Sequence, residues 1–202
     1  MASRSRQALL DAGAEVFARR GLKGTRIREI VERAGVNERM IYDHFGSKEG
    51  LYQAVLEEQS AGIGAAWQPY LEDLAGRDAV EGTRLALRAF FDLVAERPLL
   101  VPLLLHEGLG EGEIRPPIDP SELPAPLREA FERGRREGAF REDGDFELFY
   151  VTAICLLTML PALPRRLGAL AGGSAEQARE RLRDQAVDLL LDGITGPAGR
   201  GR

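Results

Sequence analysis

The 202-residue sequence predicts an all-α protein in which a small N-terminal three-helix domain precedes a larger helical bundle. Apolar residues recur every three or four positions along nearly the whole chain, and this spacing is helical. The alternation of apolar and polar residues that marks strands is almost absent. Glycines and capping residues divide the periodic stretches into helices of ordinary length. No internal repeat interrupts this organisation.

The first two helices are bounded by residues that commonly begin and end helices. Apolar residues at i, i+3, i+7 and i+8 predict a helix from about residue 5 to residue 20, which Gly21 ends. Thr25 is a suitable N-cap for a second, short helix that closes at Gly35. The sequence therefore predicts two helices before residue 36.

A third helix is predicted over residues 38–45, with Asn37 as its N-cap. Gly46 ends it, and Ser47 caps a fourth helix that begins at Lys48. A helix ending at residue 34, a two-residue turn and a second short helix together predict a helix-turn-helix.

The remaining chain predicts an all-helical body. A long helix is expected from residue 51 to residue 66 or 74, and a shorter one begins at residue 98 or 102 and ends at 109. The other expected helices are 79–96, 127–137, 145–163 and 175–194. Glycine and proline content predicts a loop at 110–126 and a disordered tail at 196–202.

Composition excludes several classes of protein. With 44% hydrophobic and 29% charged residues, the chain has the composition of an ordinary globular protein. An apolar stretch of sixteen residues without charge, 148–163, is short for a bilayer span and predicts a buried or interface helix. The N-terminus lacks the apolar core of a signal peptide. A single cysteine, Cys155, excludes an intrachain disulfide and is expected to be buried as a small hydrophobic residue. We expect no metal or cofactor and a reducing, cytoplasmic location.

Charge is distributed unevenly along the chain. Residues 1–50 contain ten basic and seven acidic side chains, whereas the rest contains seventeen basic and twenty-five acidic ones. A basic N-terminal part suits a polyanionic partner, because cationic side chains release counterions from phosphates. Alone, an excess of three charges is equally consistent with chance.

The predicted third helix has one inward and one outward face. Ile41 and Phe45, four residues apart, are expected to pack against the first two helices. The outward side chains are then Glu38, Arg39, Met40, Tyr42, Asp43 and His44. A helix that exposes arginine, tyrosine and histidine suits the major groove of DNA, where side chains reach both base edges and phosphates.

These residues resemble the TetR family of bacterial transcriptional regulators. The resemblance covers about residues 5–57 and rests on Ala12, Phe17, Gly21, Thr25, the run Ile30-Val-Glu-Arg-Ala-Gly-Val and the run Ile41-Tyr-Asp-His-Phe-Gly-Ser-Lys-Glu-Gly-Leu. It implies a DNA-binding domain at 1–47 and a ligand-binding and dimerisation domain at 48–195. It further implies a homodimer on a near-palindromic operator, a small-molecule effector and, most often, repression.

By position, the resemblance implies a set of DNA contacts. Phosphate contacts fall to the second helix and to the start of the fourth, and the third helix lies in or beside the groove. The candidates are Thr25, Arg26, Arg28, Asn37, Glu38, Arg39, Met40, Tyr42, His44 and Lys48. Arg39 stands where a small residue is common in the family. Asp43 adds negative charge beside the groove and can either accept from a cytosine amine or pair with Arg39.

The helical body offers weaker candidates. A moderately hydrophobic effector is expected, with pocket walls drawn from Trp67, Tyr70, Phe90, Phe91, His106, Tyr150, Thr152 and Met159. His106 precedes Glu107, but adjacent helical side chains diverge by about 100°, which favours a pocket-wall or surface histidine over a catalytic one. The apolar helix 145–163 and a stripe on the last helix predict a two-fold, four-helix interface, and the stripe consists of Leu182, Ala186, Leu189 and Leu190.

Other interpretations remain open at this stage. Tyr42 could fill a gap over Phe45, and Lys48 could be an ordinary solvated side chain. The whole chain could be an all-α oligomeric enzyme or small-molecule binding protein whose helix-turn-helix is structural only. Against an enzyme stands the lack of a glycine-rich phosphate loop, a GxSxG sequence or metal-ligand spacing.

Overall fold

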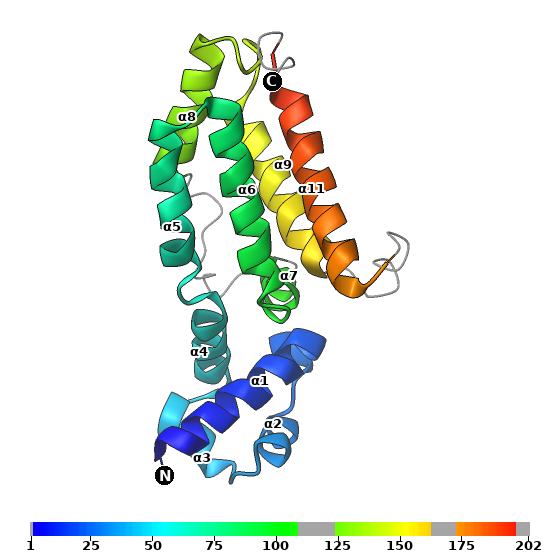
Figure 1. The fold of residues 1–202 in the computed structure, drawn as a ribbon. Helices are drawn as coiled ribbons and strands as arrows, with labels where there is room; N and C mark the ends of the chain where they lie inside the picture. The colour runs from blue at the N-terminus through cyan, green and yellow to red at the C-terminus, as the bar shows by residue number, and fades with distance from the viewer. Residues whose placement is uncertain (1, 109–123, 163–172, 197–202) are drawn as a thin grey trace. The chain divides into compact units, whose positions relative to one another are not determined.

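The computed structural model describes residues 2–108, 124–162 and 173–196, and these residues are helical apart from their connections (Figure 1). Within these ranges, the only extended pairing is an isolated antiparallel bridge between Phe140 and Thr195. No helix in the described part of the chain is long and apolar enough to cross a membrane. The helices form two compact units.

The first unit contains the N-terminal helices and one later helix. Its elements are α1 (Ala2–Gly24), α2 (Ile27–Ala34), α3 (Arg39–Phe45), α4 (Lys48–Ser60) and α7 (Leu100–Gly108). The predicted helix-turn-helix is thus confirmed as α2 and α3. The packing also places α4 and α7 with these helices, so the compact unit extends beyond the boundary expected after residue 47.

Two details of α1 and α2 differ from the sequence prediction. Gly21 interrupts the regular helix as predicted, at φ 65° and ψ 177°, but the chain resumes helical structure after this kink, so α1 continues to Gly24. Thr25 does not cap α2, because Arg26 precedes that helix and the Thr25 hydroxyl donates to the carbonyl of Gly21 at 2.7 Å. A threonine hydroxyl can donate to a carbonyl of the preceding turn or accept from an N–H of the following helix, and Thr25 makes the first of these bonds.

The connections around α3 are close to the sequence prediction, although α3 begins at Arg39, one residue later than predicted, and Glu38 rather than Asn37 precedes it. Gly35 ends α2 in the left-handed conformation, at φ 66°, which few other residues adopt readily. Asn37 Oδ1 accepts from the backbone N–H of Arg39 at 2.9 Å. Ser47 Oγ accepts from the backbone N–H of Gly50 at 3.0 Å and so caps α4. These local bonds fix where α3 begins and where it leads into α4.

A continuous apolar core fixes the arrangement of the first unit. The ring of Phe17 on α1 meets the ring of Tyr52 on α4 edge to face, with centroids 4.8 Å apart. The core also receives Ile30 from α2, Ile41 from α3 and Leu103 from α7, each fully buried. Every helix of the unit therefore contributes to the same core, which holds α3 at a defined orientation.

The second unit contains the remaining helices. Its elements are α5 (Ile63–Asp73), the 3₁₀ turn η1 (Leu74–Gly76), α6 (Ala79–Ala95), α8 (Ala125–Arg136), α9 (Phe146–Ala162) and α11 (Ala175–Ile194). The single long helix predicted after residue 50 is wrong, because the chain breaks at Gly62, at φ 76°, between α4 and α5. The loop predicted at 110–126 lies outside the described residues up to 123, and α8 begins at Ala125. The predicted tail lies outside them from residue 197.

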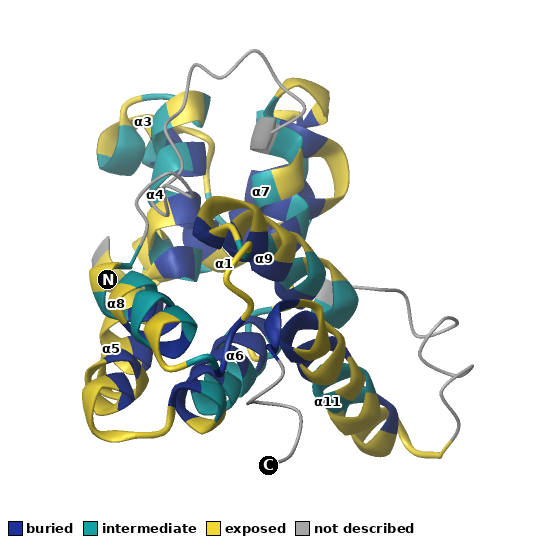
Figure 2. Cartoon of the chain, turned by 90° about the horizontal axis from the view of Figure 1, so that it is seen from above, coloured by how far each residue is buried: buried dark blue, intermediate teal, exposed yellow. Residues whose placement is uncertain are grey.

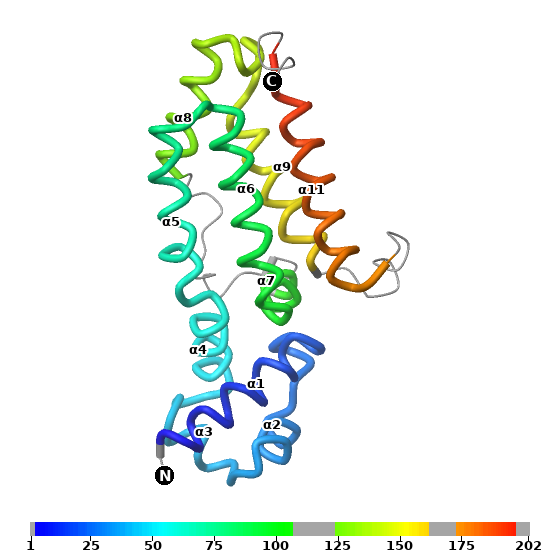
Figure 3. The backbone as a smooth tube through the Cα atoms, viewed as in Figure 1, coloured from blue at the N-terminus to red at the C-terminus, as the bar shows by residue number. Residues whose placement is uncertain are grey.

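Helix α6 occupies the centre of this unit and packs against α5, α8, α9 and α11. The backbone trace in Figure 3 shows α6, α9 and α11 running side by side. A cluster of aromatic rings joins α8 to α9, and in it Phe131 lies 5.4 Å from Phe140 and from Phe146 between centroids. Figure 2 shows that α11 is buried on one side and exposed on the other. These contacts leave the outer faces of α9 and α11 uncovered by the described part of this chain.

Candidate nucleic-acid interface

Most side chains that were predicted to face outward from α3 are exposed in the structure. Ile41 is fully buried in the core of the first unit, whereas Tyr42, the next residue, is 49% exposed. Glu38, Arg39 and Asp43 are also exposed. Because Ile41 is fixed in the core, the opposite face of this two-turn helix is held outward.

Met40 differs from the prediction that it faces outward. Its side chain is half-buried and packs against the core of the first unit. Met40 is adjacent to Ile41, about 100° away around the helix, so it lies at the edge of the buried face. The outward face of α3 is therefore narrower than the sequence predicted.

Two of the candidate arginines are paired with carboxylates on their own helices. Arg39 lies 3.6 Å from Asp43, and Arg28 lies 2.7 Å from Glu32. The hydrogen bond to Glu32, together with its charge, raises the pKa of the Arg28 guanidinium. In the free protein, Asp43 thus takes the pairing with Arg39 that the sequence left open. Exposed i, i+4 pairs contribute little, so a phosphate or base can replace either carboxylate.

Lys48 is held by the end of α1. Its Nζ donates to the carbonyl oxygens of Leu22 at 2.9 Å and Thr25 at 3.3 Å. The Leu22 carbonyl also accepts from the backbone N–H of Thr25 at 3.4 Å, so the Lys48 cation adds a charge-assisted hydrogen bond at the negative, C-terminal end of α1. Thr25 itself is only 3% exposed, and its hydroxyl already donates to Gly21. Lys48 therefore has one N–H donor left for a phosphate, whereas the Thr25 hydroxyl could donate to a phosphate only by giving up its bond to Gly21.

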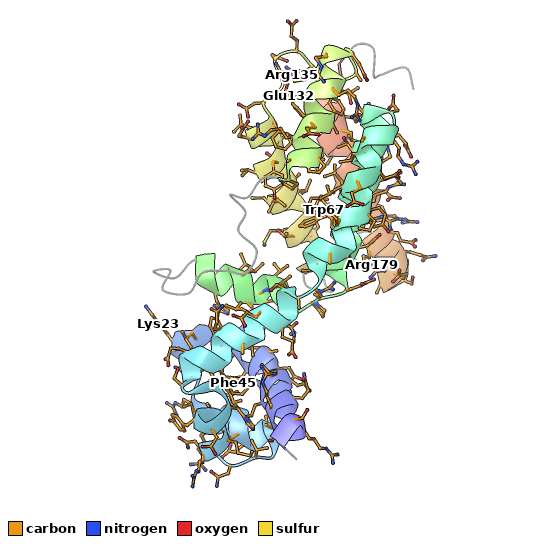
Figure 4. All side chains as sticks on the ribbon, turned by 90° about the vertical axis from the view of Figure 1, so that its left-hand side faces the viewer. Lys23, Phe45, Trp67, Glu132, Arg135 and Arg179 are labelled. Carbon is orange, nitrogen blue, oxygen red and sulfur yellow. The ribbon has the colours of Figure 1, made fainter. Side chains whose placement is uncertain are left out.

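Lys48→Ala is expected to lower the free energy of unfolding by about 1–2 kcal/mol, because two charge-assisted hydrogen bonds are removed. Lys23→Ala removes the same charge from the exposed surface of α1 and is the matched control (Figure 4). It should change stability by less than about 0.5 kcal/mol. Urea unfolding at a fixed salt concentration measures both. Equal stabilities of the two variants would show that the carbonyl contacts of Lys48 do not hold α1.

The first turn of α1 lies against the end of α3, and sequence reasoning did not include it. The Ser5 hydroxyl is hydrogen-bonded to Nε2 of His44 at 3.2 Å. The guanidinium carbon of Arg6 lies over the Phe45 ring, 5.3 Å from its centroid. His44 is therefore partly engaged within the protein, while Arg26 and Asn37 remain exposed. The only sequence signal was a pair of arginines at positions 4 and 6.

The candidate pocket residues do not gather at one place. His106 belongs to the first unit, where its ring lies against Gly21. Tyr70, Thr152 and Met159 are exposed. The remaining four are buried in the second unit, namely Trp67, Phe90, Phe91 and Tyr150. Sequence periodicity predicts burial but not which buried side chains meet.

The buried aromatic residues are already in contact with other groups. The Trp67 and Phe90 rings are 4.9 Å apart between centroids, and Trp67 Nε1 donates to the carbonyl of Ala86 at 2.8 Å. Burial raises the pKa of the Tyr150 phenol. Sequence reasoning missed Thr83, whose buried hydroxyl has no hydrogen-bond partner within the described part of the chain. A threonine inside a helical pattern gives no signal of this kind.

The four predicted interface residues divide into two pairs. Ala186 and Leu190 are 2% and 6% exposed, and both are buried within their own chain because α11 packs on α6 and α9. Leu189 is 57% exposed, and Leu182 is half-buried. Cys155 is exposed rather than buried, which corrects the prediction that it is a core residue. The four residues therefore do not form one exposed stripe, because Ala186 and Leu190 face this chain's own core while Leu189 faces outward.

The geometry of α2 and α3, with an exposed polar face on a helix fixed by a tight turn, defines a helix-turn-helix protein. A family model described as "Bacterial regulatory proteins, tetR family" matches residues 9–55. The HTH-type transcriptional repressor NicS of Pseudomonas putida is 35% identical over 147 residues, which are 70% of this chain and 68% of that protein. The HTH-type transcriptional repressor KstR2 of Mycolicibacterium smegmatis is 29% identical over 96% of this chain and 92% of its own length.

Solved structures show the same fold. The ketosteroid transcriptional regulator KstR2 of Mycobacterium tuberculosis superposes with a TM-score of 0.67 over 94% of each chain, at 22% sequence identity. The chain belongs to the TetR family of bacterial transcriptional regulators. It is therefore a DNA-binding transcriptional regulator, and the enzyme alternative is not favoured.

Proposed function

We propose that the protein represses transcription by binding a near-palindromic operator as a homodimer, with one α3 helix in the major groove of each half-site. The observation that carries this proposal is the exposed face of α3, where Arg39 and Tyr42 project from a helix anchored by Ile41. Side chains on such a helix can reach base edges and phosphates together. We also propose a cytoplasmic location, because the chromosome of a bacterium lies there.

The operator can be found without knowing the target gene. Purified full-length protein is used to select duplexes from a library with 30 randomised base pairs, and the selected pool is sequenced. The proposal predicts an inverted repeat whose half-sites are centred about one helical turn apart, or somewhat more. Recovery of no preferred sequence at moderate salt would reject sequence-specific regulation by this chain. Recovery of a single, unrepeated site would reject the two-fold arrangement.

Arg39 and Tyr42 are proposed to have different tasks. Arg39→Ala should relax the preference at particular base pairs, with a loss of about 1–3 kcal/mol there, because arginine recognises base edges directly. Tyr42→Ala should weaken binding to all duplexes equally, because phosphate contacts do not depend on sequence. Fluorescence anisotropy with the operator and with single-base variants separates the two effects. A uniform loss with Arg39→Ala would make Arg39 a phosphate contact instead.

We propose that the dimer forms through the outer faces of α9 and α11. Leu148, Val151 and Met159 are exposed on α9, and their spacing of three and eight residues places them within about 80° of one another around the helix. Thr152 and Cys155 lie on the same face, which carries no charge. Leu189 adds an exposed apolar side chain on the neighbouring α11. Exposed apolar stripes of this kind are typical of protein–protein contacts.

We propose that a small, moderately hydrophobic effector binds in the second unit and reduces operator affinity. Phe90 and Thr83 are seven residues apart on α6 and therefore share a face of that helix. Thr83 could donate to an otherwise apolar effector, because its hydroxyl has no partner within the described residues. To shift the protein from a state that binds the operator to one that does not, an effector must bind the second state more tightly by about 5 kcal/mol. A thermal-shift screen of apolar carboxylates, lactones and sterols, compared with Thr83→Val, tests this site.

A further inference from the structure

The first turn of α1 has a defined position relative to α3. Ser5 on α1 is hydrogen-bonded to His44 on α3, and Arg6 lies over the ring of Phe45. These two contacts involve consecutive residues on each helix, so they fix the orientation of the turn as well as its distance. Arg4 and Arg6 are exposed and lie on either side of the anchored Ser5.

Most other arginines of the first unit already have acidic partners. The ion pairs are Arg20–Glu29, Arg28–Glu32, Arg33–Glu15 and Arg39–Asp43. Among the described residues, neither Arg4 nor Arg6 forms an ion pair with a carboxylate. A phosphate approaching Arg4 or Arg6 therefore displaces no carboxylate. The first turn of α1 thus carries uncompensated positive charge directly beside the end of α3.

The contact between Arg6 and Phe45 leaves the arginine able to bind an anion. A cation–π contact involves the charge of the guanidinium but none of its five N–H donors. The ring limits the freedom of the side chain, which reduces the entropy cost of binding a phosphate. Arginine is also the side chain best suited to bidentate phosphate contacts.

We infer that Arg4 and Arg6 bind the phosphodiester backbone of the DNA that flanks each half-site, beyond the base pairs facing α3. Helix α3 is seven residues long, about 10 Å, which covers roughly three base pairs. The turn anchored at its C-terminal end lies outside that span. This inference rests on the proposed function, because it extends the same operator complex.

The test uses the full-length chain and the duplex recovered by selection. Arg4→Ala with Arg6→Ala is compared with Arg19→Ala and Lys23→Ala together, which removes two charges from exposed positions 13 to 19 residues, about 20–28 Å, further along α1. Both double variants have the same net charge, so long-range attraction is matched. Affinity is measured by anisotropy from 50 to 300 mM salt. Two duplexes are used, one ending at the half-sites and one with six further base pairs on each side.

On the longer duplex, the slope of log affinity against log salt should decrease by about 0.9 for each phosphate that the variant no longer neutralises. The control pair should keep the wild-type slope. Shortening the duplex should weaken the wild-type protein but leave the Arg4 and Arg6 double variant nearly unchanged. Arg4→Ala alone should give half the change in slope, and because the Arg4 side chain is exposed, its removal should not disturb α1.

Two results would overturn the inference. One is the same salt slope for both double variants, and the other is an unchanged response of the Arg4 and Arg6 variant to shortening of the duplex. In either case, specific binding by the wild-type protein would leave the proposed function intact. If the wild-type protein selects no duplex, the proposed function fails as well. Circular dichroism of all variants confirms that α1 remains helical.

Discussion

Val151→Glu together with Leu189→Glu is expected to make the protein monomeric and to lower operator affinity by about 10³-fold or more. Both side chains are more than half exposed, at 56% and 57%, so the substitutions place charge on the outer faces of α9 and α11 without disturbing the core. A monomer has only one α3 helix, so its affinity for the operator should be little higher than its affinity for unrelated DNA. Specific complexes exceed non-specific ones by about 10³–10⁷-fold at physiological salt.

Sedimentation velocity measures the mass of this variant, circular dichroism its helicity and anisotropy its operator affinity. Tyr70→Glu is the matched control, because Tyr70 is a similarly exposed apolar side chain of the second unit, on α5. It should remain dimeric. A double variant that is still dimeric, with wild-type affinity, would place the interface elsewhere.

Leu190→Glu separates the interface from the core. Leu190 is buried within its own chain, so a carboxylate there should lower the free energy of unfolding by several kcal/mol. A loss of dimers in that variant would accompany a loss of helicity and would say nothing about the interface. The exposed neighbour Leu189 is therefore the informative position.

The parts of this fold that the sequence predicts are those that local chemistry decides. Gly35, Asn37 and Ser47 each act on the backbone within four residues, so their roles can be read from the chain itself. The same is true of Ile41, whose place in the core follows from the period of the helix. These residues were enough to predict the helix-turn-helix and the centre of its exposed face, but not that Met40 packs against the core.

The parts that the sequence does not predict depend on contacts distant along the chain. Lys48 bonds to carbonyls 23 and 26 residues earlier, which no local pattern indicates. Leu190 and Leu189 share an apolar run, but only packing decides which faces the chain's own core. Gly62 breaks a continuous helical pattern although a glycine within a helix is often tolerated. A candidate site assembled from sequence alone therefore includes residues that have structural tasks.

Gly21→Ala is expected to lower the free energy of unfolding by about 2–3 kcal/mol, because Gly21 has a backbone conformation that is nearly restricted to glycine. Its φ of 65° and ψ of 177° produce the kink in α1. An added Cβ would also lie 3.0 Å from Nδ1 of the His106 ring. The substitution thus combines backbone strain with a close contact to α7.

A double-mutant cycle separates these two effects. His106→Ala removes the ring that the new methyl group meets, so Gly21→Ala should be less destabilising in that background, while the backbone strain remains. Gly24→Ala is the control within the same helix, because Gly24 has no positive φ, and it should be neutral or slightly stabilising. Equal effects of Gly21→Ala with and without His106 would show that α7 does not restrain the kink.

The kink matters for α3 because several bonds converge on it. The Gly21 carbonyl accepts from Thr25, immediately before α2, and the next carbonyl, that of Leu22, accepts from Lys48 at the start of α4. Relaxing the kink would therefore release both ends of the helix-turn-helix at once. In Gly21→Ala, operator affinity should fall even at temperatures where the protein remains folded. Wild-type affinity in a folded but destabilised Gly21→Ala protein would show that the orientation of α3 is set by the apolar core alone.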